Sequence, residues 1–410
     1  MVLVAEILCD MVKEIGGFHM TDIVILGGAR TAIGGFGGAL AGTTPIALGT
    51  IVAKAAIERS GISADQIGQV AYGHVINTEP KDMYVSRVAA MDAGIPDTVP
   101  AMNVNRLCGS GAQAIVSMVQ SLVMGDAEFA LAGGTENMSR SPFIISDQRW
   151  GAKMGDIQTR DMMLGALNCP FGTGHMGVTA ENVAAEHGIS REDQDAFALE
   201  SQTHAAAAVE AGYFTDQIVP VPVRVRRDTV DFVTDEHPKA TTAAQLASLR
   251  PAFQKDGTVT AGNASGLNDG AAAIVMATAD AAATAGLTPA FRILGYAHAG
   301  VRPEVMGIGP VPAVEKLLAK TGLKAQDFDV IESNEAFAAQ AIAVNRALGL
   351  DPAKVNPNGG AIALGHPVGA TGAIITIKAM YELERTQTKR ALITMCIGGG
   401  QGIALAIERL

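Results

Sequence analysis

The sequence contains the same order of strands and helices twice, and this repeat limits the possible fold more than any other feature. Near the start, the strand-like "TDIVILGG" is followed by a helix-like segment that stops at Gly61, and then by a second strand-like segment. From position 291 the same order returns, with "FRILGYAHAG" as the strand and a glycine as the helix stop. Glycine directly after an apolar-periodic segment is a common helix terminator.

The repeat continues into the next helix and strand of each half. The first half reads "NVNRLCGSGAQAIVSMVQ" and "FALAGGTEN", and the second reads "NPNGGAIALGHPVGATGAIITIKAM" and "ALITMCIGGGQG". Strands that alternate with helices are typical of a mostly parallel sheet covered on both faces. We therefore predict an α/β protein with a duplicated α/β/α core.

A long insert separates the halves. Its Gly, Pro and charged clusters break the repeat, and one clear helix begins at Ser190, has Asp193 in capping-box spacing and stops at Gly212. Because the insert is too long for a linker, we expect a loop domain. The predicted organisation is an N-terminal extension at 1–19, a first half at 20–138 completed by about 268–288, a loop domain at 139–267 and a second half at 289–410.

The N-terminal extension is predicted to be an extended start or an appended helix. Its acidic residues Glu6, Asp10 and Glu14 argue against a transit peptide. We read Cys9, which lies in it, as a bystander.

Composition excludes several functions. A charge of −11 and a pI near 5.2 argue against a broad nucleic-acid surface. We find no apolar run of the ~18 residues needed to span a bilayer, so we predict a soluble, cytoplasmic protein without membrane insertion. Four cysteines, at 9, 108, 169 and 396, form no C-x-x-C pair or zinc spacing, which favours a reducing compartment and no metal site.

Three residues occupy matching points of the repeat. Cys108 comes just before a helix of the first half, His366 lies at about the same point of the second, and Cys396 ends a strand in "MCIGGG". Ligands of open α/β sheets bind beyond the carboxyl ends of strands, so one crevice could hold all three.

Each candidate also has a structural interpretation. Free cysteine is usually core, but the small residues after Cys108 give access to its sulfur, and a helix N-terminus stabilises a thiolate. His366, in a glycine-rich turn, can be aimed at a neighbour or be a buried structural group. Cys396 is core by default, although amides of the following glycines could bind an oxyanion.

Two further residues and the glycine-rich tail complete this reading. Asn334 in "ESNEAF" is either a helix N-cap or a residue that holds a water, and Cys169 has no activating neighbour and reads as structural. The tail "GGGQG" ends too close to Leu410 for a dinucleotide fold.

Taken together, "NRLCGSG", "HMGVTAENVA", "TAGNASGLNDGAA", "NEAFAAQA", "NGGAIALGHPVGATGA" and "CIGGGQGIA" resemble, in this order, the motifs of thiolases from Met20 to Leu410. The resemblance implies two thiolase-type α/β halves with a loop domain inserted in the first. It also implies Claisen condensation or thiolysis of acyl-CoA.

The resemblance assigns roles to the candidate catalytic residues. Cys108 would be acylated, His366 would activate its sulfur, and Cys396 would move the α-proton of the second acetyl-CoA. Asn334, through a water, would form one oxyanion site with His366, and the amides of Cys108 and Gly398 would form the other. Such chemistry splits a carbon–carbon bond-forming step into two acyl transfers and needs no metal or redox cofactor.

Contacts to CoA, a substrate here and not a cofactor, carry over by the same resemblance. They fall on His175, Met176, Phe253, Ala261 and Ser265. Arg224, Arg226 and Arg227 in "VRVRRD" form either a solvated face or, with Lys239, partners for the CoA phosphates.

The histidine of "GHMG" resembles short-chain enzymes, so we predict an acetyl-CoA C-acetyltransferase that condenses acetyl-CoA to acetoacetyl-CoA and CoA. A broad-range 3-ketoacyl-CoA thiolase of β-oxidation is the alternative. A decarboxylating ketosynthase is disfavoured, since its relatives have a second histidine where Cys396 stands, and a non-catalytic acyl-CoA or lipid-binding protein is less favoured still. The resemblance also implies a homodimer or homotetramer.

Overall fold

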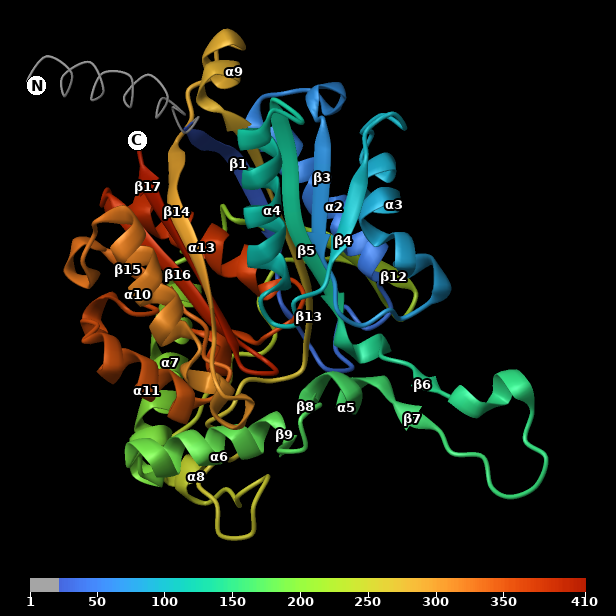
Figure 1. Ribbon diagram of the computed structural model, residues 1–410, viewed down its shortest axis with the longest axis vertical. Coiled ribbons are helices and arrows are strands. Elements are labelled where there is room, and N and C mark those ends of the chain that lie inside the picture. Colours follow the sequence, from blue (N-terminus) through green and yellow to red (C-terminus); the bar gives the residue numbers. More distant parts are fainter. Residues whose placement is uncertain (1–21) are drawn as a thin grey trace, which may run out of the picture.

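A computed structural model describes residues 22–410, so the predicted N-terminal extension and Cys9 lie outside the described residues. One large sheet runs through the molecule in the order β15-β16-β17-β14-β1-β13-β5-β3-β4 (Figure 1). Its second-half strands are β14 (Phe291–Gly300), β15 (Val330–Ser333), β16 (Arg390–Ile397) and β17 (Gln401–Arg409). Its first-half strands are β1 (Ile23–Thr31), β3 (Gln69–Gly73), β4 (Ala101–Val104), β5 (Phe129–Asn137) and β13 (Asn268–Thr278).

The α/β fold class is confirmed, but the expectation of a mostly parallel sheet is wrong. Parallel pairs such as β3–β5 and β15–β16 occur beside the antiparallel pairs β1–β13, β5–β13, β14–β17 and β16–β17. The chain returns from β16 to β17 through a tight turn, where Gly399 and Gly400 have φ of 84° and 87°. A short turn of this kind joins antiparallel neighbours, whereas parallel strands need a crossover.

Alternating residues of the strands divide the core into layers. In β16, one set of alternate residues packs into the central core and includes Ile393, while Leu392 packs on the opposite face with Val314 and Leu317 of α10 (Pro310–Thr321). In the first half, α2 (Pro45–Ser60) covers the corresponding outer face. Successive side chains of a strand point to opposite faces, so each half of the sheet buries both.

The helices α4 (Ser110–Met124) and α13 (Thr371–Thr386) form the central layer (Figure 1). They contact each other and strands of both halves. The segment Leu107–Met124 is in fact long and apolar enough to span a membrane by length and composition, which corrects our count of apolar runs. More than half of it is buried in this core, as expected of a central helix in a folded domain.

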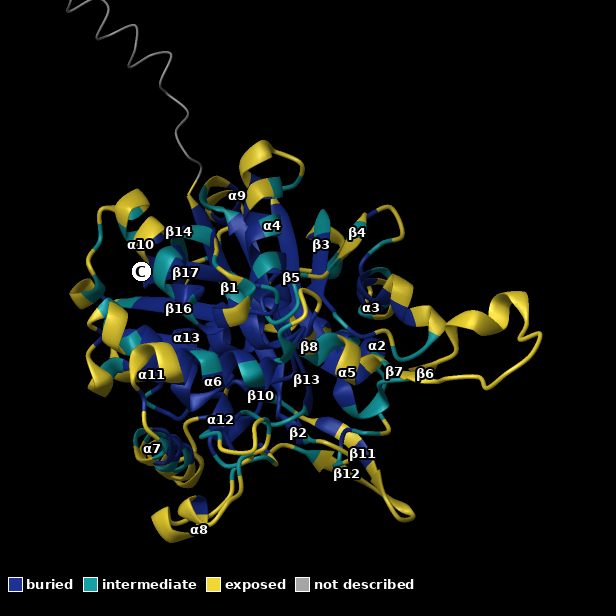
Figure 2. Ribbon diagram, turned by 60° about the horizontal axis from the view of Figure 1, so that its bottom comes forward, coloured by how far each residue is buried: buried dark blue, intermediate teal, exposed yellow. Residues whose placement is uncertain are grey.

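The insert at 139–267 contributes small elements around the central sheet. Its helices are α5 (Met162–Leu167), α6 (Met176–His187), α7 (Arg191–Glu210) and α8 (Ala243–Ala247). Its strands are β6 (Phe143–Ile144), β7 (Arg160–Asp161), β8 (Asn168–Cys169), β9 (Gly174–His175), β10 (Ile218–Val219), β11 (Val221–Val225) and β12 (Asp228–Phe232). The capping box of Ser190 and Asp193 at α7 is confirmed. Of these strands, β10 pairs with β1. Residues 145–159, between β6 and β7, form an exposed arm that extends away from the sheet (Figure 2).

The remaining elements connect these layers. They are β2 (Gly34–Gly35), which pairs with β13, and the helices α3 (Val85–Asp92), α9 (Ala279–Thr284), α11 (Ala338–Leu348) and α12 (Ala361–Leu364). Short 3₁₀ turns lie between them.

Candidate active site

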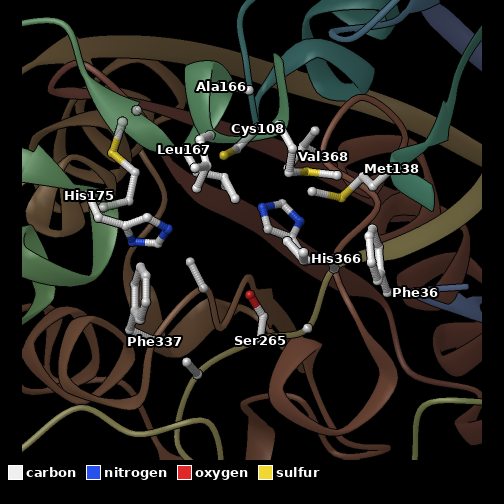
Figure 3. Close-up of a pocket in the computed structure, with 18 of the residues that line it drawn as sticks. Phe36, Cys108, Met138, Ala166, Leu167, His175, Ser265, Phe337, His366 and Val368 are labelled. Carbon is white, nitrogen blue, oxygen red and sulfur yellow. The ribbon is translucent and has the colours of Figure 1, made fainter. Parts of the chain in front are cut away.

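A cavity of about 650 Å³ lies between the core and the insert. Cys108 and His366 both line it, and Figure 3 shows their side chains pointing into the same space. Its walls are mainly apolar and include Phe36, Met138 and Phe337. A concave apolar site with few polar groups is the usual form of a small-molecule binding site.

Cys108 lies on a tight turn that leads into α4. Leu107 has a φ of 45°, and the Ser110 hydroxyl donates to Leu107 O and accepts from the Arg106 amide. A Cβ at Gly109 would come within 2.5 Å of the Ile397 side chain, so the glycine lets this turn pack closely against the end of β16. The turn holds the sulfur of Cys108 toward the cavity, half-buried.

The expectation of a stabilised Cys108 thiolate is wrong for the protein at rest. Burial raises the pKa of Cys108 to about 11, and the negative charge of Glu136 adds to the rise. The amides of Gly398 and of Cys108 itself oppose it through hydrogen bonds to the sulfur. A helix N-terminus contributes less than the loss of water here, so the thiol needs a partner that takes its proton.

His366 is built to be that partner. Its backbone amide donates to Asn268 Oδ1, and its Nδ1 lies 2.6 Å from the hydroxyl of Thr371. Nε2 is buried and has no hydrogen-bond partner within residues 22–410. Burial lowers the pKa of His366 to about 4, so the ring is neutral near pH 7 and can accept a proton.

Close approach of α4 and α13 brings these two residues together. A Cβ added at Gly372 would come within 2.2 Å of Ala112 N, and one at Gly111 within 2.8 Å of Ala373 N. The first turns of both helices therefore touch backbone to backbone. Because Cys108 and His366 precede these turns, the repeat delivers one from each half to the same cavity.

Cys396 lies just behind the cavity wall. It is fully buried in β16, next to Met176 and Phe337, and is not among the lining residues. Burial raises its pKa, and the nearby Cys108 raises it further, so the two sulfurs interact. Gly398, two residues on, lines the cavity.

The interpretation of Asn334 as a helix N-cap is wrong. Helix α11 begins at Ala338 with Phe337 as its N-cap, and the Asn334 amide donates to Thr394 O. Neither polar atom of the Asn334 side chain has a partner in the described chain, although the residue is buried. Asn334 lines a small second cavity together with Thr371, the residue that contacts His366.

The five residues that the resemblance links to CoA all line the main cavity: His175, Met176, Phe253, Ala261 and Ser265. The His175 ring stacks on Phe253 at 4.7 Å between centroids, and its Nδ1 accepts from the Gly177 amide. Figure 3 shows His175 and Ser265 among the side chains around the cavity. Burial lowers the pKa of His175.

The basic residues considered as phosphate partners are separated in the structure. Lys239 lines the cavity. By contrast, Arg224, Arg226 and Arg227 lie at the exposed turn of the β11–β12 hairpin and do not line it. Cys169 is buried in the cluster around Met176 and Cys396, consistent with a structural residue.

Family comparisons agree with this geometry. The thiolase N-terminal domain model matches residues 23–280, and the thiolase C-terminal domain model matches residues 287–409. The chain belongs to the thiolase family. The predicted family, fold class and acyltransferase activity are thereby confirmed.

Among thiolases, the beta-ketothiolase BktB of Cupriavidus necator is 57% identical over 95% of this chain and 99% of its own length. The acetyl-CoA acetyltransferase of Escherichia coli is 50% identical over 95% of this chain and all of its own. The crystal structure of the Bacillus anthracis acetyl-CoA acetyltransferase superposes with a TM-score of 0.93 at 46% identity, covering 95% of this chain and 99% of that one. Human mitochondrial 3-ketoacyl-CoA thiolase in complex with CoA gives 0.92 at 44% identity, covering 95% and 98%.

Two residues near the thiolase site escaped sequence reasoning. Thr371 comes five residues after His366, at the first position of α13, and Glu136 is the next-to-last residue of the otherwise uncharged "FALAGGTEN". A single carboxylate in a wholly buried strand was the available signal for Glu136, because a buried charge needs partners.

Proposed function

We propose that this thiolase is an acetyl-CoA C-acetyltransferase that condenses two acetyl-CoA molecules to acetoacetyl-CoA and CoA, and catalyses the reverse thiolysis. The reaction would pass through an acetyl group on Cys108. The observation that supports it best is the pair formed by a half-buried Cys108 thiol and a neutral His366 with unpartnered Nε2, both lining one cavity.

In the first step, His366 takes the Cys108 proton as Sγ attacks the thioester carbonyl. The new C–S bond forms, the bond to CoA breaks, and the departing CoA thiolate receives the proton back. Amides of Cys108 and Gly398 already donate toward the sulfur, so they are placed to bind charge on the adjacent carbonyl oxygen.

In the second step, once Cys108 is acetylated, Cys396 gives up its proton and its thiolate removes a proton from the α-carbon of a second acetyl-CoA. The carbanion attacks the acetyl carbon, a C–C bond forms, and the bond to Cys108 breaks. The departing Cys108 thiolate takes up the proton that Cys396 first gave up, so both cysteines end as thiols. The interaction between the two sulfurs supports this role, because formation of one thiolate disfavours the other. Asn334 and His366 would hold the enolate oxygen, Asn334 through a water.

The length of the acyl chain that the enzyme accepts is a separate question. The apolar group next to Cys108 includes Met138, Met163 and Leu167, and leaves room for more than an acetyl group. This favours, as a second candidate, a 3-ketoacyl-CoA thiolase of broader range, and a relative of this chain is a beta-ketothiolase.

The deciding experiment is CoA-dependent thiolysis of acetoacetyl-, 3-ketohexanoyl- and 3-ketodecanoyl-CoA, with Cys108→Ala as the blank. Fast turnover of the four-carbon substrate alone supports the acetyltransferase. Comparable rates on longer substrates support the second candidate. No turnover above the blank supports a binding protein.

We also propose a homodimer or homotetramer in the cytoplasm. Strand β4 is an edge of the described sheet and exposes Met102, while Trp150 and Met154 of the arm beyond β6 and β7 are almost fully exposed (Figure 2). Unpaired edges and large apolar patches favour self-association. Light scattering of wild type and of Trp150→Ser, Met154→Ser would test whether the arm joins dimers.

A further inference from the structure

Glu136 is a carboxylate on the central strand β5, one residue before the end of the strand. It is fully buried, yet its two oxygens accept three backbone amides, from Val75 at 3.0 Å, Ile76 at 3.1 Å and Gly369 at 2.9 Å. Hydrogen bonds from several amides stabilise the ionised form of a buried carboxyl.

The three amides come from two segments of the chain, one in each half of the repeat. Val75 follows β3 of the first half and itself lines the cavity. Gly369 lies between His366 and α13, in the second half. One carboxylate therefore joins the two halves of the repeat three residues from His366.

The fit at this junction is tight. A Cβ at Gly369 would come within 2.4 Å of Glu136 Oε2, and one at Gly134 within 2.3 Å of Gly369 O. No side chain fits between the turn of His366 and β5, so the carboxylate contacts the turn directly.

His74 is the ionisable neighbour of Glu136. Its Nδ1 lies 2.9 Å from Thr135 O and 3.6 Å from Glu136 Oε1, and its buried Nε2 has no partner within residues 22–410. The Nδ1 proton is thus donated to a carbonyl. Burial raises the pKa of Glu136, whereas His74 and the three amides lower it.

We propose that Glu136 is a positioning residue for acyl transfer: its carboxylate holds the His366 turn against the Val75–Ile76 loop, and so fixes where the base stands in the cavity. The inference rests on the proposed roles of Cys108 and His366.

The test compares Glu136→Gln with Glu181→Gln. Glu181 is also a buried carboxylate that accepts backbone amides, but these belong to Thr258 and Val259 and not to the His366 turn. In Glu136→Gln, kcat for acetoacetyl-CoA thiolysis should fall by about 10-fold or more while KM for CoA stays nearly unchanged, because the base loses its fixed position. In Glu181→Gln, kcat should stay near the wild-type value.

Gly369→Ala is a second variant that serves if Glu136→Gln does not fold. It displaces the carboxylate from the turn, so kcat for thiolysis should fall more than KM for CoA changes. Wild-type kcat in Glu136→Gln or in Gly369→Ala overturns the proposal. Alkylated enzyme that remains active would instead contradict the proposed role of Cys108, so the two failures are distinguishable.

Discussion

The Nδ1 atom of His366 lies 2.6 Å from Oγ1 of Thr371, whose hydroxyl is 2.9 Å from Pro367 O. A carbonyl can only accept, so the threonine donates its proton to Pro367 and accepts from Nδ1. The neutral ring must then carry its proton on Nδ1 and present a bare Nε2 to the cavity. This tautomer is the one that can receive a proton from Cys108.

Thr371→Val should remove the hydrogen bond that fixes the orientation of the His366 ring. We expect kcat for acetoacetyl-CoA thiolysis to fall roughly 10- to 100-fold, because a base without fixed orientation loses part of its catalytic effect. Thr376→Val is the matched control, since Thr376 bonds only to Gly372 O in the same helix. Equal losses in both variants would assign the effect to the helix instead.

The acetylation of Cys108 by acetyl-CoA should be nearly constant between pH 8 and pH 6. Burial lowers the pKa of His366 to about 4. The neutral ring, which is the form that accepts a proton, is therefore fully populated between pH 6 and pH 8 and is lost only as the pH falls toward 4. A histidine with an ordinary pKa would retain only about a quarter of its base form at pH 6. Rapid-quench measurement of the acetyl-enzyme checks this, and a threefold loss by pH 6 would contradict it.

Iodoacetamide should modify Cys108 before the other described cysteines. Cys169 and Cys396 are buried, and Cys108 is partly exposed in the cavity. Because burial raises the pKa of Cys108 to about 11, its alkylation rate should rise steadily from pH 7 to pH 10. Peptide mapping after partial labelling measures this, and faster labelling of Cys169 would count against the assignment.

Cys396→Ser should separate the two proposed steps. Acetylation of Cys108 by radiolabelled acetyl-CoA should stay close to the wild-type rate, because Cys396 does not line the cavity where His366 and Cys108 meet. Condensation should fall by about 100-fold or more, since serine forms its alkoxide far less readily than cysteine forms the thiolate that acts as the base. A parallel loss of both steps would remove the separate role of Cys396.

Asp235→Asn should destabilise the protein. Arg30 is fully buried on β1, and Asp235 contacts its guanidinium at 2.7 and 2.9 Å. An uncompensated buried cation costs roughly 3–5 kcal/mol, to be measured by urea unfolding. Glu186→Gln, which breaks the exposed pair with Arg302, should cost under about 1 kcal/mol, and a similar cost for both would be inconsistent with this account.

Sequence patterns predicted the elements that repeat. The helix stops at Gly61 and Gly322 are left-handed C-caps, and the capping box at Ser190 is present. These features depend on neighbouring residues alone. The direction of the strands was not predictable in this way, because pairing of β13 between β1 and β5 joins segments more than 100 residues apart.

The sequence predicted which residues form the site, but it did not predict the protonation state of Cys108. Cys108 and His366 line the cavity as expected. The state of the Cys108 thiol depends on burial and on Glu136, both set by tertiary packing, and local sequence contains neither. Asn334 failed as an N-cap because the chain continues extended to Phe337 before the helix starts.

Backbone contact between α4 and α13 has a consequence for biosynthesis. The nucleophile and its base enter the cavity from opposite halves of the chain, at a junction where Gly111 and Gly372 admit no side chain. While the ribosome is still making the second half, the finished first half therefore holds a cysteine without its base. The cysteine and histidine therefore come together only when α13 docks against α4, after residues of both halves have been made.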